Sequence, residues 1–557
     1  MQTVRRLYLY LMSGITLGVL AVGLRMVLVV LFDALGLGRG AFIGGDPNGD
    51  RQQLSLALAF IGVGLPVWGI HWWLAERGLH TGAPHAEDER GSWLRALYLT
   101  LVLGVLLAFG ASAGADLLRA LITNLVGVSP DYGYATPDVA GGLATLVVTG
   151  IGWGYHVATR RRDMSVGPLT EAAAWLPRAY LYGAALVGLS VLLQSVGDLV
   201  GLIGNALIPQ TGNVRYGGID NYQLTTTLVP IIVAGAVWFG HWWYAGRLVR
   251  DSSWRGMSER PSRLRLAYLV AIIAGSVASL VRLVAEAFGA VLVPVFSAQR
   301  NFGSDLTASD MARVIGVALV SALPWAVAWW YHRRTMTGEA VASGDPARSA
   351  TATRLDLHAT ALVGLAFGAV AIGWLLGLLL DVLLGGDRSS GDFWRGELTM
   401  FVPFAVIGSA VWLWWWWRIE ARYVADPNVE AVSTVRRSYL LIILAASLIA
   451  SIGSLAFVLY RLFGTILGAE LGGNAASELS APIGALLAAA AVAAYHGQAL
   501  RRDTAVRAAE VAAAPEATVA PEARRQLTLI GPAGEDLDVA VAGLRLDLPE
   551  GYRLEDS

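Results

Sequence analysis

The chain has 557 residues, of which 55% are hydrophobic and only 15% are charged, whereas soluble domains carry roughly 25% charged residues. A formal net charge of −1 argues against nucleic acid as a principal partner, and the absence of cysteine excludes disulfides, thiolate catalysis and Cys-ligated metal centres. All 41 basic residues are arginine, so Schiff-base lysines and P-loop lysines are excluded as well.

Apolar runs long enough to cross the ~30 Å hydrocarbon core of a bilayer recur along the whole chain. We therefore predict an all-α fold, a polytopic helical membrane protein with about twelve transmembrane helices. The first run follows Arg5 and Arg6 but lacks a small-residue cleavage site, so we expect a mature helix rather than a signal peptide. The predicted helices span residues 6–33, 54–74, 94–120, 141–158, 177–205, 224–244, 264–292, 311–331, 354–383, 398–417, 436–465 and 482–499.

A histidine near the end of every second apolar run marks an internal repeat, and a tryptophan usually stands three residues before it. Successive markers are about 85 residues apart, and tryptophan replaces histidine at the fifth position. We predict that the markers are interfacial side chains that keep a polar edge in water at the end of a helix. The six markers are His71, His156, His241, His332, Trp415 and His496.

The alternative for this row of histidines is ligation of haem or of a transition metal by imidazoles from several helices. No predicted helix carries two of the marker histidines, and one position holds Trp415, so the pattern disfavours ligation. We therefore predict no metal site and no cofactor.

A second marker opens the first apolar run of each repeat. It is an arginine with a tyrosine two or three residues later, as at Arg6–Tyr8, and Arg354 and His358 take these places in the fifth repeat. Because each repeat holds two helices, every copy enters the membrane in the same direction, and the repeats are parallel. We predict six two-helix repeats at residues 1–90, 91–174, 175–260, 261–350, 351–432 and 433–503, followed by a cytoplasmic tail at 504–557.

Arginines are distributed unevenly between the two sets of loops. The N-terminus and the connectors between repeats hold 23 arginines, and the loops within repeats hold 6. Because cytoplasmic loops are enriched in arginine, we predict a bacterial inner (plasma) membrane protein with both termini in the cytoplasm and the lipid bilayer around it. Residues 526–548 alternate in polarity around a turn, which predicts a small β-hairpin-like element in the tail that could contact a protein partner.

Several ionisable residues lie within the predicted first helices, where charge is costly and often marks function. They form a candidate polar pathway, which consists of Arg25, Asp116, Asp198, Arg282 and Glu286. The three acids each lie 18 residues after the tyrosine marker, about 27 Å along a helix, which places them near the outer boundary of the membrane. Two interpretations stay open: a shared polar vestibule, or interfacial charges that pair locally, as Asp116 can pair with Arg119.

The segments LYLYLMSGITLGVLAVGL (7–24) and SLALAFIGVGLPVWGIHWW (55–73) resemble a bacterial membrane family known as domain of unknown function 5671. Related patterns cover residues 1–503. The resemblance implies a repeated membrane fold and brings no activity with it.

No catalytic motif predicts an enzyme. We interpret the chain as an inner-membrane protein of unknown activity with a structural or assembly role. The alternative is a secondary transporter or channel whose polar pathway is lined by the first-helix charges. A haem-binding membrane protein is the third hypothesis.

Overall fold

The computed structural model of the protein describes residues 2–37, 47–79, 86–126, 138–165, 171–207, 221–296, 308–386, 393–467 and 473–513. The β-hairpin-like element predicted at 526–548 lies outside the described residues. Fifteen helices lie within the described part, and twelve of them are long. The long helices are α1 (Gln2–Ala34), α2 (Pro47–Arg77), α4 (Trp93–Val126), α5 (Val139–Ser165), α6 (Glu171–Leu207), α7 (Asn221–Arg250), α9 (Arg263–Val295), α10 (Ala308–Ala342), α11 (Pro346–Leu383), α12 (Phe393–Ala425), α14 (Thr434–Ile466) and α15 (Ala475–Ala513).

Each long helix extends past the predicted apolar run at one or both ends. The 33 residues of α1, for example, correspond to about 50 Å, which exceeds the ~30 Å hydrocarbon core. The polar first and last turns therefore project beyond the apolar layer.

The protein is a multi-pass membrane protein. Eleven of the described helices are long and apolar enough to cross a bilayer, and α5 is the long helix outside this set. Its first turns contain Gly141, Gly142 and Thr145, which lower its hydropathy. Apolar side chains such as Leu11, Val63 and Ile151 are exposed on the outer faces of the helices, as contact with lipid requires.

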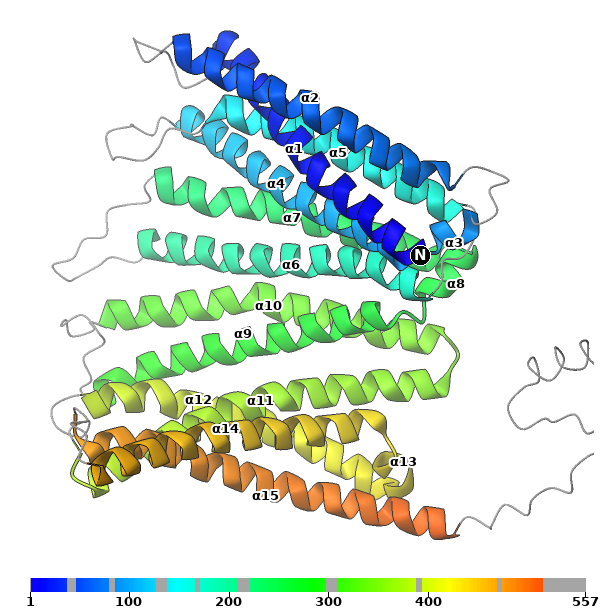
Figure 1. Ribbon diagram of the computed structural model, residues 1–557. Helices are drawn as coiled ribbons and strands as arrows, with labels where there is room; N and C mark the ends of the chain where they lie inside the picture. The colour runs from blue at the N-terminus through cyan, green and yellow to red at the C-terminus, as the bar shows by residue number, and fades with distance from the viewer. Residues whose placement is uncertain are drawn as a thin grey trace, which may run out of the picture.

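The long helices form three four-helix units in chain order. They are the first unit (α1, α2, α4, α5), the middle unit (α6, α7, α9, α10) and the third unit (α11, α12, α14, α15), which stand in a row (Figure 1). Within every unit the first helix packs against the other three. At each junction the third helix of one unit contacts the first two helices of the next, and the second junction has in addition an extensive contact between α10 and α11.

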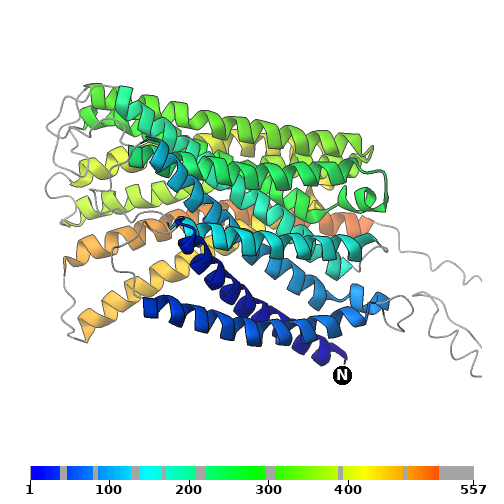
Figure 2. The ribbon, with the colours of Figure 1, turned by 90° about the horizontal axis from the view of Figure 1, so that it is seen from above.

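Both views show the helices running between two ends of the molecule (Figures 1 and 2). The start of α1 and the end of α15 lie at one end, together with the short helices α3 (Ala86–Arg90), α8 (Trp254–Glu259) and α13 (Pro427–Ala431). We call this the connector end and the opposite one the loop end.

The short helices of the connectors were not predicted. Ser253 caps α8 by accepting a hydrogen bond from the backbone of Arg255, and Asp426 caps α13 in the same way from Val429. Such caps satisfy amide groups that a helix of five or six residues cannot pair internally. The caps thus stabilise the starts of α8 and α13.

Candidate functional site

The connector end of every unit contains a buried arginine on its third helix. These arginines are Arg95, Arg265 and Arg436, at most 3% exposed. Each forms an ion pair with an acid on the fourth helix of its unit, because burying a guanidinium without an anion is costly. The pairs are Arg95–Asp163 at 2.7 Å, Arg265–Glu339 at 2.5 Å and Arg436–Asp503 at 2.6 Å.

A second ion pair attaches the connector to the first helix. The glutamate of each connector lies six residues before the buried arginine, and this spacing is the signal that sequence reasoning missed. The pairs are Arg6–Glu89 at 2.7 Å, Arg178–Glu259 at 2.8 Å and Arg354–Glu430 at 3.0 Å. The connector is thereby tied to the long helices.

A tyrosine joins the two ion pairs in the first and middle units. In the middle unit, the Tyr182 hydroxyl donates to Glu259 at 2.7 Å and accepts from Nη1 of Arg265 at 3.3 Å. Tyr10 makes the same two bonds in the first unit, to Glu89 at 2.8 Å and from Arg95 at 3.5 Å. Each of these units therefore has one continuous polar network at its connector end.

The third unit departs from this pattern because His358 stands in the tyrosine position, four residues after Arg354. Nη1 of Arg436 and Nε2 of His358 are buried and have no hydrogen-bond partner among the described residues. The alignment of His358 with Tyr8 is therefore wrong: the counterpart of Tyr8, two residues after the arginine, is Asp356.

Glu430 compensates in the third unit by accepting from two arginines. Nε and Nη2 of Arg354 each donate to one oxygen of the Glu430 carboxylate at 3.0 Å, and Nε of Arg422 donates to it at 3.3 Å. Burial acts to raise the pKa of Glu430, but the hydrogen bonds and charges of Arg354 and Arg422 outweigh it and hold the pKa below its ordinary value of 4.5.

The marker histidines form hydrogen bonds within the protein. Nδ1 of each donates to the carbonyl oxygen four residues earlier, which leaves Nε2 to accept from a tyrosine hydroxyl. Four histidines make both bonds, with His–Tyr distances of 3.1–3.2 Å, in the pairs His71–Tyr8, His156–Tyr98, His241–Tyr180 and His332–Tyr268. A metal ligand would have to give up one of these bonds.

The expectation that the markers keep a polar edge in water is wrong for three of them. His156, His332 and His496 are 1% exposed. His496 makes the carbonyl bond at 2.9 Å, while its Nε2 has no partner. At the fifth position, Trp415 lies beneath the guanidinium of Arg333, which pairs with Asp356. The described residues contain no group of three or more His, Asp or Glu able to hold a metal ion.

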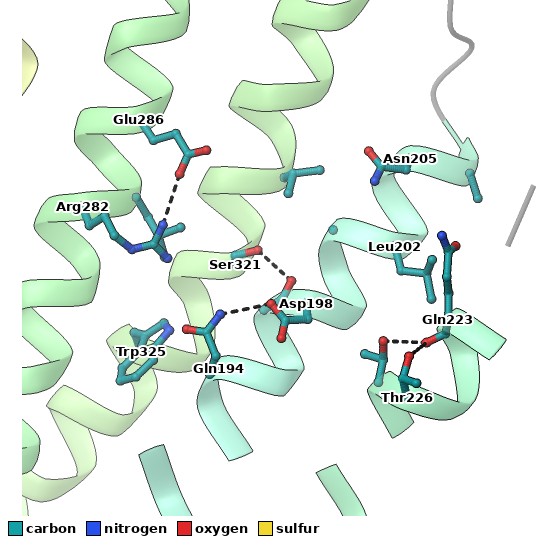
Figure 3. Close-up of a pocket in the computed structure, with 16 residues that line it drawn as sticks. Gln194, Asp198, Leu202, Asn205, Gln223, Thr226, Arg282, Glu286, Ser321 and Trp325 are labelled. Carbon is teal, nitrogen blue, oxygen red and sulfur yellow. Dashed lines mark hydrogen bonds and ion pairs between the residues drawn. The ribbon is translucent and has the colours of Figure 1, made fainter. Parts of the chain in front are cut away.

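Three of the five predicted pathway residues meet in one cleft of the middle unit. Asp198 of α6 and both Arg282 and Glu286 of α9 line a cavity of about 460 Å³ on the loop-end half of the unit (Figure 3). Arg282 forms an ion pair with Glu286 at 3.3 Å, whereas Asp198 accepts a hydrogen bond from the Gln194 amide at 3.0 Å. The lining also includes the polar residues Asn205, Gln223, Thr226, Thr227 and Ser321, together with apolar residues such as Leu202, Val317 and Trp325.

The other two predicted residues lie in the first unit. Asp116 pairs with Arg119 at 2.7 Å on the same helix, and Nε of Arg25 donates to Thr145 at 2.8 Å. The structure therefore brings three of the five charges together and leaves two outside the cleft.

The third unit has a cleft at the equivalent place, with a cavity of about 570 Å³, but its lining is apolar. Equivalence follows from counting residues from the marker arginines and histidines. Five polar or charged positions of the middle cleft have an apolar or small counterpart, whereas Asn205 and Gln223 correspond to Asp381 and Glu397, which do not line the third unit's cavity. Val370, Trp374, Gly453, Phe457 and Ala485 replace Gln194, Asp198, Arg282, Glu286 and Ser321. The polar cleft is thus a property of side chains, on a helix arrangement that both units share.

The family described as "Domain of unknown function (DUF5671)" matches the chain in three segments, residues 6–162, 178–323 and 354–495. Each segment covers most of one four-helix unit. No curated protein and no solved structure matches the chain. Since the three segments cover well over half of the sequence, the chain is a member of the DUF5671 family, with the domain present three times.

Proposed function

We propose that this protein binds a small polar solute in the cleft of its middle unit, as a carrier or receptor, and that the two flanking units support that cleft. The observation behind the proposal is Asp198, a carboxylate whose partner in the described structure is a neutral amide, in a cavity that also holds an ion pair. A cavity of about 460 Å³ is within the ~300–1,000 Å³ of small-molecule sites.

The depth of the cleft supports a functional interpretation over a purely interfacial one. Asp198 lies 20 residues after Arg178, or about 30 Å along α6. Exposed apolar side chains continue beyond the charges toward the loop end, with Ile203 on α6 and Val291 on α9. Charges flanked by apolar surface on both sides are costly in a membrane and are favoured where they meet water or a ligand.

Local pairing explains part of this arrangement. It accounts for Arg282 with Glu286, which are four residues apart on one helix, and for Asp116 with Arg119. It does not account for the convergence of Asp198, Gln194 and Ser321 from two further helices on the same space. A ligand-binding cleft accounts for both.

A structural or assembly role is the second candidate. It is favoured by the ion pairs that hold the connector in every unit, since they rigidify all three units alike. The two roles are compatible, because the polar cleft belongs to the middle unit.

We further propose that α5 is a twelfth span, that the units are built from six two-helix repeats, and that both termini face the cytoplasm at the inner membrane. The Tyr–His bond occurs in both halves of the first unit and of the middle unit, which supports the two-helix repeat. The arginine-rich connectors support the sidedness.

The test is a thermal-stability screen of the purified full-length protein against small cationic, anionic, zwitterionic and neutral polar solutes. We expect one charge class to raise the apparent Tm of the wild type, because binding to the folded state stabilises it. The response should disappear in the combined variant Asp198→Asn, Arg282→Gln, Glu286→Gln. The matched control is Asp116→Asn, which removes a charge of similar exposure outside the cleft. A solute response that survives the combined variant would contradict the proposal.

A further inference from the structure

A separate cavity lies at the connector end, where the first unit meets the middle unit. It has a volume of about 280 Å³ and lies among α5, α6, α7 and the short helix α8. Three arginines line it, namely Arg160, Arg178 and Arg255. This cavity is at the opposite end of the helices from the polar cleft.

Two of the three arginines have no carboxylate partner within the described structure. Arg178 is neutralised by Glu259 at 2.8 Å. Arg160 donates to the carbonyl oxygen of Pro177 at 3.3 Å and lies over the ring of Tyr180. A carbonyl dipole and an aromatic ring compensate the positive charge of a guanidinium less than an anion would. An anion next to Arg160 is therefore still favourable.

Arg255 contributes the second uncompensated charge. Its Nη2 donates to the carbonyl oxygen of Met164 at 2.9 Å, and its guanidinium lies near the ring of Trp254. With Arg178 and Glu259 cancelling each other, the cavity lining has a net charge of +2. A doubly positive cavity attracts an anion with more than one acceptor oxygen.

The rest of the lining indicates which anion. The side chains of Tyr244 and Ser258 add hydroxyl groups, while Met164, Leu181 and Leu248 make one part of the cavity apolar. Guanidinium groups suit phosphate oxygens, and basic pockets between helices at the membrane surface bind anionic headgroups. We infer that this cavity binds a phosphate ester, carried by an anionic lipid headgroup or by a soluble phosphate.

The equivalent junction between the middle and third units has no arginine at the positions of Arg160 and Arg255, although Arg418 and Arg422 stand there in the places of Tyr244 and Leu248. Met336 lies four residues after His332, as Arg160 lies four residues after His156, and it is 2% exposed. Asp426 lies four residues before Glu430, in the place of Arg255. Since the third helix of one unit contacts the first two helices of the next at both junctions, that packing does not require the two arginines.

The experiment titrates phosphatidylglycerol into the purified full-length protein in a non-ionic detergent and follows the apparent Tm. Phosphatidylcholine serves as the zwitterionic comparison. We expect phosphatidylglycerol to raise the Tm of the wild type, and Arg160→Met to increase the lipid concentration at half-effect at least tenfold. Arg161→Met is the matched control, because Arg161 is an exposed neighbour that carries the same charge. It should respond as the wild type does.

Equal responses of the two variants, or equal stabilisation by phosphatidylcholine, would overturn the inference. Should Arg160→Met fail to give a monodisperse protein, Arg255→Gln takes its place under the same criteria. Glycerol phosphate and inorganic phosphate identify the source of the ligand. Competition by either one supports a site for phosphate itself, and an Arg160-dependent lipid response without competition supports a site for the whole headgroup.

Discussion

The middle and third units have the same four helices in the same contacts, yet they differ at both ends. At the loop end, Asp198 and Glu286 of the middle unit correspond to Trp374 and Phe457 of the third. At the connector end, Tyr182 corresponds to His358. The comparison shows that the helix arrangement provides a cleft and a connector in each unit, and that a few side chains decide their chemistry.

Position in the row offers a physical reason for the difference. The middle unit has a neighbour on both sides, whereas the third unit is the last of the row (Figure 1). A terminal unit presents more of its surface to lipid, where an ionised side chain costs about 2.5–3.5 kcal/mol at mid-membrane. An apolar lining avoids that cost, while an enclosed unit can keep charged groups around a hydrated space.

We expect the largest effect in the rate of thiol labelling, which compares the access of water to the two clefts. Because the natural chain has no cysteine, single cysteines report on one position each. We expect Gln194→Cys and Ser321→Cys to react with a charged, membrane-impermeant thiol reagent at least tenfold faster than Val370→Cys and Ala485→Cys, because thiolate forms in water and is disfavoured in an apolar cleft. Labelling of intact cells followed by mass-shift electrophoresis measures the rates. Similar rates in the two units would remove the distinction between the clefts.

A smaller effect is expected when the tyrosine position at the connector end is substituted in the middle and third units. Tyr182→Phe leaves both Arg265 and Glu259 short of one hydrogen bond and should destabilise the middle unit by roughly 1–3 kcal/mol. His358→Phe should cost less, because it removes a single hydrogen bond, from Nδ1 to the Arg354 carbonyl oxygen at 2.7 Å, and Nε2 has no partner among the described residues to lose. Hydrogen exchange of the α8 and α13 amides measures the two local effects.

His358→Tyr is the converse variant. A hydroxyl at this position can accept from Nη1 of Arg436, so we expect slower exchange in α13 than in the wild type. Faster exchange in His358→Tyr, or a larger effect of His358→Phe than of Tyr182→Phe, would contradict the conclusion that the third unit lacks the hydrogen bonds of a tyrosine at this position.

The sequence predicts the long helices well, because long apolar runs with arginine and histidine markers need no tertiary information. It also predicts the local pairs, since Arg282 and Glu286 are four residues apart on one helix. The connector glutamates were missed because a helix of five or six residues among charges is indistinguishable from a linker. Their arginine partners are about 80 residues away in the chain, as with Arg6 and Glu89.

The polar cleft was predictable only in part, for a geometric reason. The repeat spacing gives the depth of a residue in the membrane but not the unit in which it lies. Asp116 and Glu286 both lie 21 residues after the buried arginine of their unit and share a depth. Glu286 joins Asp198 in the cavity that α6, α7, α9 and α10 line, whereas Asp116 does not line it, although its helix α4 also packs against α6.

The smallest expected effect concerns pH and the compensation by Glu430 in the third unit. The folded-state pKa of Glu430 is lowered, so its ion pairs stabilise the folded protein fully above the unfolded-state pKa. This stabilisation is lost as the pH falls through the folded-state pKa. We therefore expect the apparent Tm difference between the wild type and Glu430→Gln to be constant from about pH 7 to 5, as the linkage relation requires, and to shrink at lower pH. The contribution should be roughly 1.5–3 kcal/mol at neutral pH, the range for hydrogen bonds to charged groups. A Tm difference that widens on acidification would mean that burial, rather than Arg354 and Arg422, dominates the pKa of Glu430, and the third unit would then have no substitute for the missing tyrosine.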